Sequence, residues 1–206
     1  MNDNGYIKGG GLISPCRKFF YLKIPKNAST FINNLLIDNQ WEEWNLIEDP
    51  IKIQNAIVFL RDPLERWISG FATYAALHLF GYGYGSDHFI EDYNLLTQKI
   101  IFDQVIFDDH TDFQVQYVNE IGHLNPIFFK CNNAIVEQLN SFLGIQLVVK
   151  HNIIDNKSDQ NYDTKQVSAY IKNIINNNLD LKSKIIYYYQ KDYNFIRQTE
   201  FYNEPR

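Results

Sequence analysis

Three short hydrophobic runs along the chain are typical of strands buried in a sheet, because each is bounded by polar or turn-forming residues. They cover residues 18–24, 56–60 and 126–130. The run 56–60 has no polar residue, as is usual for parallel strands buried on both faces. We expect these runs to form the centre of a parallel sheet.

Between these runs the hydrophobic positions recur every three to four residues, which predicts helices. The first helix is expected to begin near Ser29 or Thr30, either of which can cap its own first turn, and the next begins after Asp62-Pro63. Gly144 is expected to end another. Later helices are expected over 86–102, 133–142, 164–178 and 181–191. The alternation predicts an α/β fold with a central parallel sheet flanked by helices.

Composition is consistent with one domain over residues 1–206, with 1–17 as an irregular N-terminal segment. Hydrophobic residues make up 45% of the chain, enough for a core that needs neither disulfides nor metal. The net charge of −5 argues against a general nucleic-acid or membrane-surface binder. Because we find no export signal and no apolar run of membrane-spanning length, we expect a soluble, cytoplasmic protein without a membrane partner.

The turn after the first predicted strand has the features of an anion site. In a β-α-β unit this turn presents free backbone N–H groups and the positive end of a helix. Here it contributes a lysine ammonium and two hydroxyls, in the run Pro25, Lys26, Asn27, Ala28, Ser29 and Thr30. The alternative, a capped helix with a solvated lysine, stays open at this point.

The second predicted strand is followed by R-D-P-L-E-R-W-I-S-G-F, residues 61–71. Arg61 is expected beside the first turn, where its guanidinium can bind a second phosphate through two hydrogen bonds. Ser69, about two helical turns further on, can add a hydroxyl contact. The alternative is a surface salt bridge at the helix start among Arg61, Asp62, Glu65 and Arg66.

Together, P-K-N-A-S-T after one strand and R-D-P-L-E-R-W-I-S after the next resemble the two cofactor motifs of sulfotransferases that use 3′-phosphoadenosine 5′-phosphosulfate (PAPS), closest to the carbohydrate (Golgi-type) branch. The resemblance implies a P-loop-like sulfotransferase fold. It implies that the first loop holds the 5′-phosphosulfate, that Lys26 assists transfer, and that Arg61 and Ser69 bind the 3′-phosphate. The product would be 3′-phosphoadenosine 5′-phosphate (PAP), and no metal is expected.

Sulfuryl transfer also needs a general base for the acceptor hydroxyl. His110, in Asp108-Asp109-His110-Thr111-Asp112-Phe113-Gln114, lies in a stretch similar to the D-x-H-x-x-x-Q of carbohydrate sulfotransferases, and a neighbouring carboxylate can orient its ring. A surface histidine among acids is the alternative. Glu42 and Glu43 are rival bases, since Trp41 and Trp44 could desolvate one of them. The alternative, which the sequence favours, is ordinary charges at a helix end between two packed tryptophans.

Lys157 and Ser158 occupy the place of a loop that often closes over the cofactor in the family, although the segment shows no full family pattern and a plain polar linker is the simpler interpretation. The sequence thus favours a PAPS-dependent sulfotransferase acting on a small-molecule or glycan hydroxyl. One alternative is a P-loop-type nucleotide-dependent phosphotransferase (kinase), against which the first loop lacks glycine and a Gly-Lys-Ser/Thr sequence. The other is a catalytically degenerate nucleotide-binding accessory protein.

Overall fold

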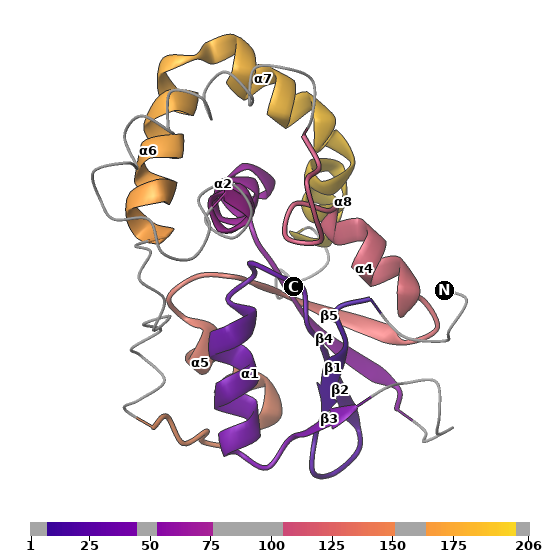
Figure 1. Ribbon diagram of the computed structural model, residues 1–206. Coiled ribbons are helices and arrows are strands. Elements are labelled where there is room, and N and C mark those ends of the chain that lie inside the picture. Colours follow the sequence, from indigo (N-terminus) through magenta and orange to yellow (C-terminus); the bar gives the residue numbers. More distant parts are fainter. Residues whose placement is uncertain (1–7, 45–52, 76–104, 151–163, 201–206) are drawn as a thin grey trace. The chain divides into compact units, whose positions relative to one another are not determined.

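A computed structural model of the chain describes residues 8–44, 53–75, 105–150 and 164–200 (Figure 1). The chain divides into two compact units. One contains Met1–Arg61, Phe113–Asn156 and Asn194–Arg206, and the other contains Asp62–Asp112 and Lys157–Tyr193. The helix expected over 86–102 lies outside the described residues. Among the helices that are described, none combines the length and the apolar character needed to cross a membrane.

The first unit is built on a five-stranded sheet with the order β3-β1-β2-β4-β5. The strands are β1 Gly11–Ile13, β2 Phe19–Leu22, β3 Glu42–Trp44, β4 Asn55–Leu60 and β5 Asn125–Lys130. Strands β2, β4 and β5 run parallel, as the three hydrophobic runs predict. Strand β1 is antiparallel to both β2 and β3, so the sheet is mixed and the expectation of a parallel sheet is wrong for this edge.

The N-terminal segment differs from the irregular structure expected over 1–17, because Gly11–Ile13 form β1. Leu12 and Ile13 are buried and contribute to different core clusters on the two faces of the sheet. A Cβ atom at Gly11 would lie 2.2 Å from the carbonyl oxygen of Tyr21, so glycine permits the close approach of β1 to β2.

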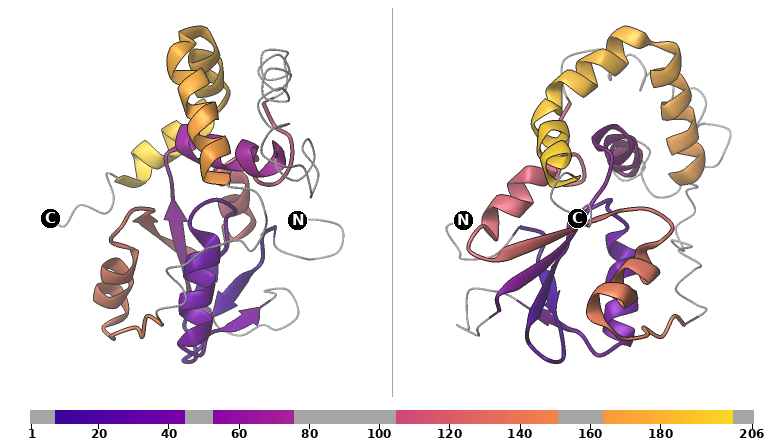
Figure 2. Two further views of the ribbon diagram at one scale, coloured as in Figure 1. Left: turned by 60° about the vertical axis from the view of Figure 1, so that its left-hand side comes forward. Right: turned by 180° about the vertical axis from the view of Figure 1, so that it is seen from behind.

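Helices cover both faces of this sheet (Figures 1 and 2). Helix α1, Ser29–Asp38, and helix α5, Ile135–Leu143, pack on one face, and Gly144 ends α5 in a left-handed conformation as predicted. Helix α4, Gln114–Glu120, packs on the other face. The described part of this unit is thus a layered α/β structure in which β2 leads through a short loop into α1.

The second unit is helical in its described part. Helix α2, Pro63–Tyr74, packs against α6, Thr164–Asn177, and α7, Leu179–Tyr188, which arch around it in Figure 1. Asp62 caps α2 by accepting a hydrogen bond from the Glu65 N–H, and Pro63 occupies the first turn, as the sequence predicts. Helix α7 ends at Tyr188 and a further helix, α8, covers Gln190–Glu200, so the helix expected over 181–191 is divided near its end. The residues of α8 are shared between the two units.

Candidate anion site and histidine turn

The loop between β2 and α1 has an unusual backbone. Lys26 and Ala28 have φ angles of 68° and 55°, in the left-handed region that non-glycine residues seldom adopt. Asn27 between them is not in that region. Backbone segments that alternate in handedness turn consecutive N–H groups toward one side, which makes a concave site for anions.

The start of α1 differs from the predicted cap. Ala28, rather than Ser29 or Thr30, is the N-cap residue, and no side-chain cap is found there among the described residues. In the described part of the chain no side-chain oxygen accepts from the first N–H groups of α1, which carry the positive end of the helix dipole. Ser29 is buried, whereas Thr30 is exposed and Lys26 and Pro25 are half-buried. The positive end of the helix thus has no side-chain acceptor within the ranges that the structure describes.

Asn27 anchors the loop to the residues beneath it in the core through hydrogen bonds of its side chain. Its side chain is 1% exposed, and its Nδ2 donates to the Phe59 carbonyl oxygen and to Gln114 Oε1, at 2.7 Å each. Its Oδ1 is buried with no hydrogen-bond partner among the described residues. An unpaired buried acceptor costs free energy, so packing stability alone does not account for an asparagine here.

Arg61, immediately after β4, lies beside this loop as predicted. Its Nη1 donates to the carbonyl oxygen of Lys26 at 2.9 Å. Among the described residues this is the one hydrogen bond of its guanidinium, which has five N–H donors. Arg61 is half-buried, so the remaining donors keep some access to solvent or ligand.

The alternative salt bridge at the start of α2 takes a different form. Glu65 pairs with Lys172 at 2.6 Å, while Arg66 is fully buried and donates to the carbonyl oxygens of Asp109 and Asp112. Ser69 is a half-buried residue of α2 in the second unit, and its carbonyl accepts a hydrogen bond from Thr73. The pairing of Ser69 with Arg61 at one phosphate stays a prediction.

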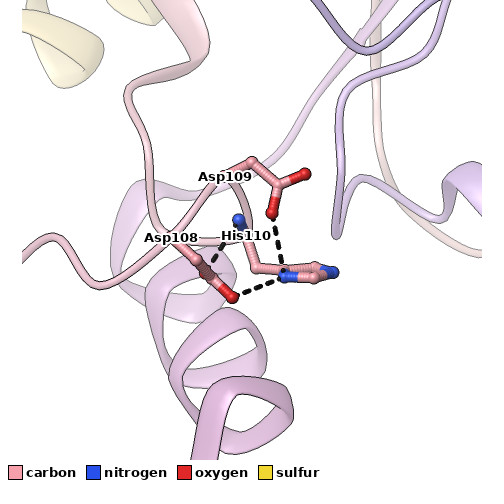
Figure 3. Close-up of side chains that lie close together, drawn as sticks. All are labelled: Asp108, Asp109 and His110. Atoms are coloured by element: carbon pink, nitrogen blue, oxygen red, sulfur yellow. Dashed lines mark hydrogen bonds and ion pairs between the residues drawn. The ribbon is translucent and has the colours of Figure 1, made fainter. Parts of the chain in front are cut away.

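His110 lies in a turn of the second unit and is held by the carboxylates that precede it (Figure 3). Its Nδ1 is 2.9 Å from Asp108 Oδ2 and 3.2 Å from Asp109 Oδ1. Figure 3 shows Nε2 pointing away from both carboxylates. When Nδ1–H donates to a carboxylate, Nε2 keeps its lone pair and can accept a proton. The expected orientation of the ring by an acidic neighbour is therefore confirmed.

Helix α2 packs against the turn that carries His110. Arg66 of α2 donates hydrogen bonds to the turn, as described above. In addition, a Cβ atom at Gly70 would lie 2.3 Å from the His110 carbonyl oxygen, so a glycine at this position allows the turn to contact the helix. The Thr111 hydroxyl accepts from the N–H groups of Phe107 and Asp108 and donates to the Asp108 carbonyl oxygen. The backbone that carries His110 is thus held by several independent bonds.

The rival bases are placed differently from the expectation. Glu42 and Glu43 belong to the edge strand β3 and are exposed, and the Glu42 side chain is 70% exposed. Trp41 and Trp44 pack into different core clusters, on opposite faces of the sheet, and both glutamates are exposed, so the tryptophans do not desolvate the carboxylates. The desolvated glutamate predicted here is wrong.

Two further expectations stay open. Lys157 and Ser158 lie outside the described residues. The ligand atoms of Asp108, Asp109 and His110 lie within 4.8 Å of one another, close enough to hold a cation, although exposed acidic groups often gather without one. That the reaction requires no metal therefore stays a prediction, as does the proximity of His110 to Lys26.

Gln114 is the residue of the site to which sequence reasoning gave no role. It is fully buried at the start of α4 and hydrogen-bonds both Asn27 and Arg61. The partners are 87 and 53 positions away in the sequence, so no local pattern signals the contact.

Comparisons of the chain with protein-family models, curated proteins and solved structures find no match.

Proposed function

We propose that this protein is a PAPS-dependent sulfotransferase that transfers a sulfuryl group to a hydroxyl acceptor, with a carbohydrate as the acceptor class, on a P-loop-like sulfotransferase fold. The order of the elements supports this. Parallel strands β2 and β4 are followed by the two motif segments, which makes their ends neighbours at one edge of the sheet.

The hydrogen bond from Arg61 Nη1 to the Lys26 carbonyl oxygen carries the proposal. It joins the second motif to the first loop, so that the Arg61 guanidinium lies next to the backbone of Lys26, two residues before the N-cap of α1. A ligand with two separate phosphate groups matches two such positive groups better than a ligand with one. PAPS has this pattern, with a 5′-phosphosulfate and a 3′-phosphate.

The chain's residues can then divide the chemistry. The acceptor oxygen attacks sulfur as the sulfur–oxygen bond to the 5′-phosphate breaks, and the electron pair goes to that phosphate. Lys26 and the N–H groups at the start of α1 stabilise the charge that develops on the phosphate. His110 Nε2 takes the acceptor proton while Asp108 and Asp109 stabilise the imidazolium that forms.

His110 is preferred to Glu42 and Glu43 as the base because its ring is oriented by hydrogen bonds, whereas Glu42 is 70% exposed on an edge strand. Arg61 and Ser69 are assigned to the 3′-phosphate, with Lys157 and Ser158 as further cofactor contacts. These assignments follow the motif resemblance.

Label transfer tests the reaction class. The protein is incubated with ³⁵S-labelled PAPS, or with γ-³²P-labelled ATP and Mg²⁺, and with a panel of sugar, phenol and peptide hydroxyl acceptors. Label from PAPS, without added metal, should appear in an acceptor together with an equal amount of PAP. Transfer of ³²P from ATP without ³⁵S transfer would identify a kinase instead, and PAP binding without transfer would identify a degenerate nucleotide-binding protein.

A further inference from the structure

The side chain of Gln114 joins the two parts of the anion site in one hydrogen-bonded ring. Its Oε1 accepts from Asn27 Nδ2 at 2.7 Å and from the Arg61 backbone N–H at 3.0 Å, and its Nε2 donates to the Arg61 carbonyl oxygen at 2.9 Å. Arg61 closes the ring by donating to the Lys26 carbonyl oxygen, next to Asn27 in the chain.

The orientation of both amides in this ring is determined by their partners. Asn27 Nδ2 faces two oxygens, Phe59 O and Gln114 Oε1, and both can only accept. Gln114 Oε1 therefore faces two donors, and its Nε2 faces a carbonyl. Exchanging oxygen and nitrogen in either amide would break at least two of these bonds.

Gln114 pairs with Arg61 in the way that a neighbouring strand would, through both the N–H and the carbonyl of one residue. The ordinary strand pairing of β4 ends at Leu60. The Gln114 side chain thus continues the hydrogen bonding of β4 by one residue beyond Leu60. That residue is Arg61, whose guanidinium donates to the loop. Because Gln114 and Asn27 are buried, at 0% and 1% exposure, water does not readily replace these bonds.

We propose that Gln114 is a positioning residue that couples the anion loop at Lys26-Asn27 to the second phosphate-binding residue, Arg61. It touches neither phosphate itself. Its role is to keep Arg61 and the loop in one fixed arrangement before the ligand binds, so that little ordering remains to be done on binding. This inference rests on the proposed function for the identity of the ligand, but the coupling itself does not depend on it.

Gln138 offers a matched control. Its Oε1 accepts from the Lys130 N–H and its Nε2 donates to the Lys130 carbonyl oxygen, the same pairing at the end of β5. It is half-buried on α5, and among the described residues its hydrogen bonds reach Lys130, Asn132 and Ala134 and no residue of the anion loop. Gln138→Met therefore removes a similar pair of hydrogen bonds between a side-chain amide and a strand end, but leaves the ring around Gln114 intact.

The experiment measures PAP affinity by isothermal titration calorimetry for the wild type, Gln114→Met and Gln138→Met. Gln114→Met should weaken PAP binding about tenfold, the scale of coupling within one hydrogen-bond network, and Gln138→Met should leave it unchanged. In an Arg61→Met background the same change at Gln114 should cost about threefold or less, because the guanidinium that Gln114 positions through the Arg61 backbone is gone. Equal additional losses with and without Arg61 would mean a general structural role and overturn the proposal.

Gln114→Asn serves as the second variant if the methionine variant does not fold, since it keeps an amide that is too short to reach both partners. Hydrogen exchange without ligand separates this inference from the proposed function. Exchange in peptides covering 24–31 and 60–62 should rise in the Gln114 variants and not in Gln138→Met. If the wild type fails to bind PAP but exchange rises this way, the sulfotransferase proposal fails and the coupling stands. Unchanged exchange contradicts the coupling.

Discussion

Replacing Gly70 with alanine tests the packing that holds the His110 turn. The new Cβ atom would lie 2.3 Å from the His110 carbonyl oxygen, 2.8 Å from its carbonyl carbon and 3.2 Å from Thr111 Cγ2. The first two are backbone atoms, and the turn that carries them is bonded to Arg66 and through the Thr111 hydroxyl, so it cannot yield freely.

Two opposing effects set the magnitude. Alanine is favoured over glycine in a helix by about 0.8–1.0 kcal/mol. Overpacking in a well-packed interior costs about 1–3 kcal/mol. We expect overpacking to win, with a net loss in the free energy of unfolding of about 1 kcal/mol.

The assay is urea unfolding followed by far-UV circular dichroism, with the midpoint compared at a constant m-value. Gly122→Ala is the control, because its Cβ would lie 3.4 Å from the nearest atom, Asn119 O, and its φ angle is not positive. That variant should be equal to the wild type or more stable by about 0.4–1 kcal/mol. A stabilised Gly70→Ala would refute the close contact between α2 and the turn.

Two further predictions concern the base and the cysteines. His110→Ala should lower sulfuryl-transfer turnover by about 10²-fold or more without weakening PAP binding, and Asp108→Asn should lower it less, as steady-state kinetics and calorimetry would show; unchanged turnover would exclude His110 as the base. The hydrogen bond with Ser14 is the main factor that lowers the pKa of exposed Cys16, whereas burial raises that of Cys131. Because the thiolate is the reactive form, iodoacetamide should label Cys16 faster than Cys131 in the wild type. Labelling of Cys16 should be slower in Ser14→Ala than in the wild type. Equal labelling rates at the two cysteines, measured by mass spectrometry, would contradict this.

Much of the framework that positions the site could be predicted from the sequence. Strand β4 is recognisable because a continuous hydrophobic run needs burial on both faces, and five of its six residues are buried. The start of α2 follows from Asp62-Pro63, a cap and a residue already constrained to helical φ. These features depend on neighbours in the chain, so local pattern is enough.

Other features depend on tertiary contacts that no local pattern contains. Strands β1 and β3 have three residues each. They form because β1 pairs with β2 on one side and with β3 on the other. The left-handed Ala28 at the N-cap runs against its own preference, so serine and threonine were the better local candidates for the cap. Gln114 was visible in the sequence, but its partners are brought to it by the fold.

Comparing the binding of PAP and 5′-AMP without metal tests the central claim most directly, because the two ligands differ only in the 3′-phosphate. Calorimetry should show that the wild type binds PAP at least about tenfold more tightly than 5′-AMP, as expected for one charge-assisted contact. In Arg61→Ala the difference should largely disappear. Equal affinities of the wild type for PAP and 5′-AMP would contradict the assignment of Arg61 to a second phosphate and, with it, the proposed use of PAPS.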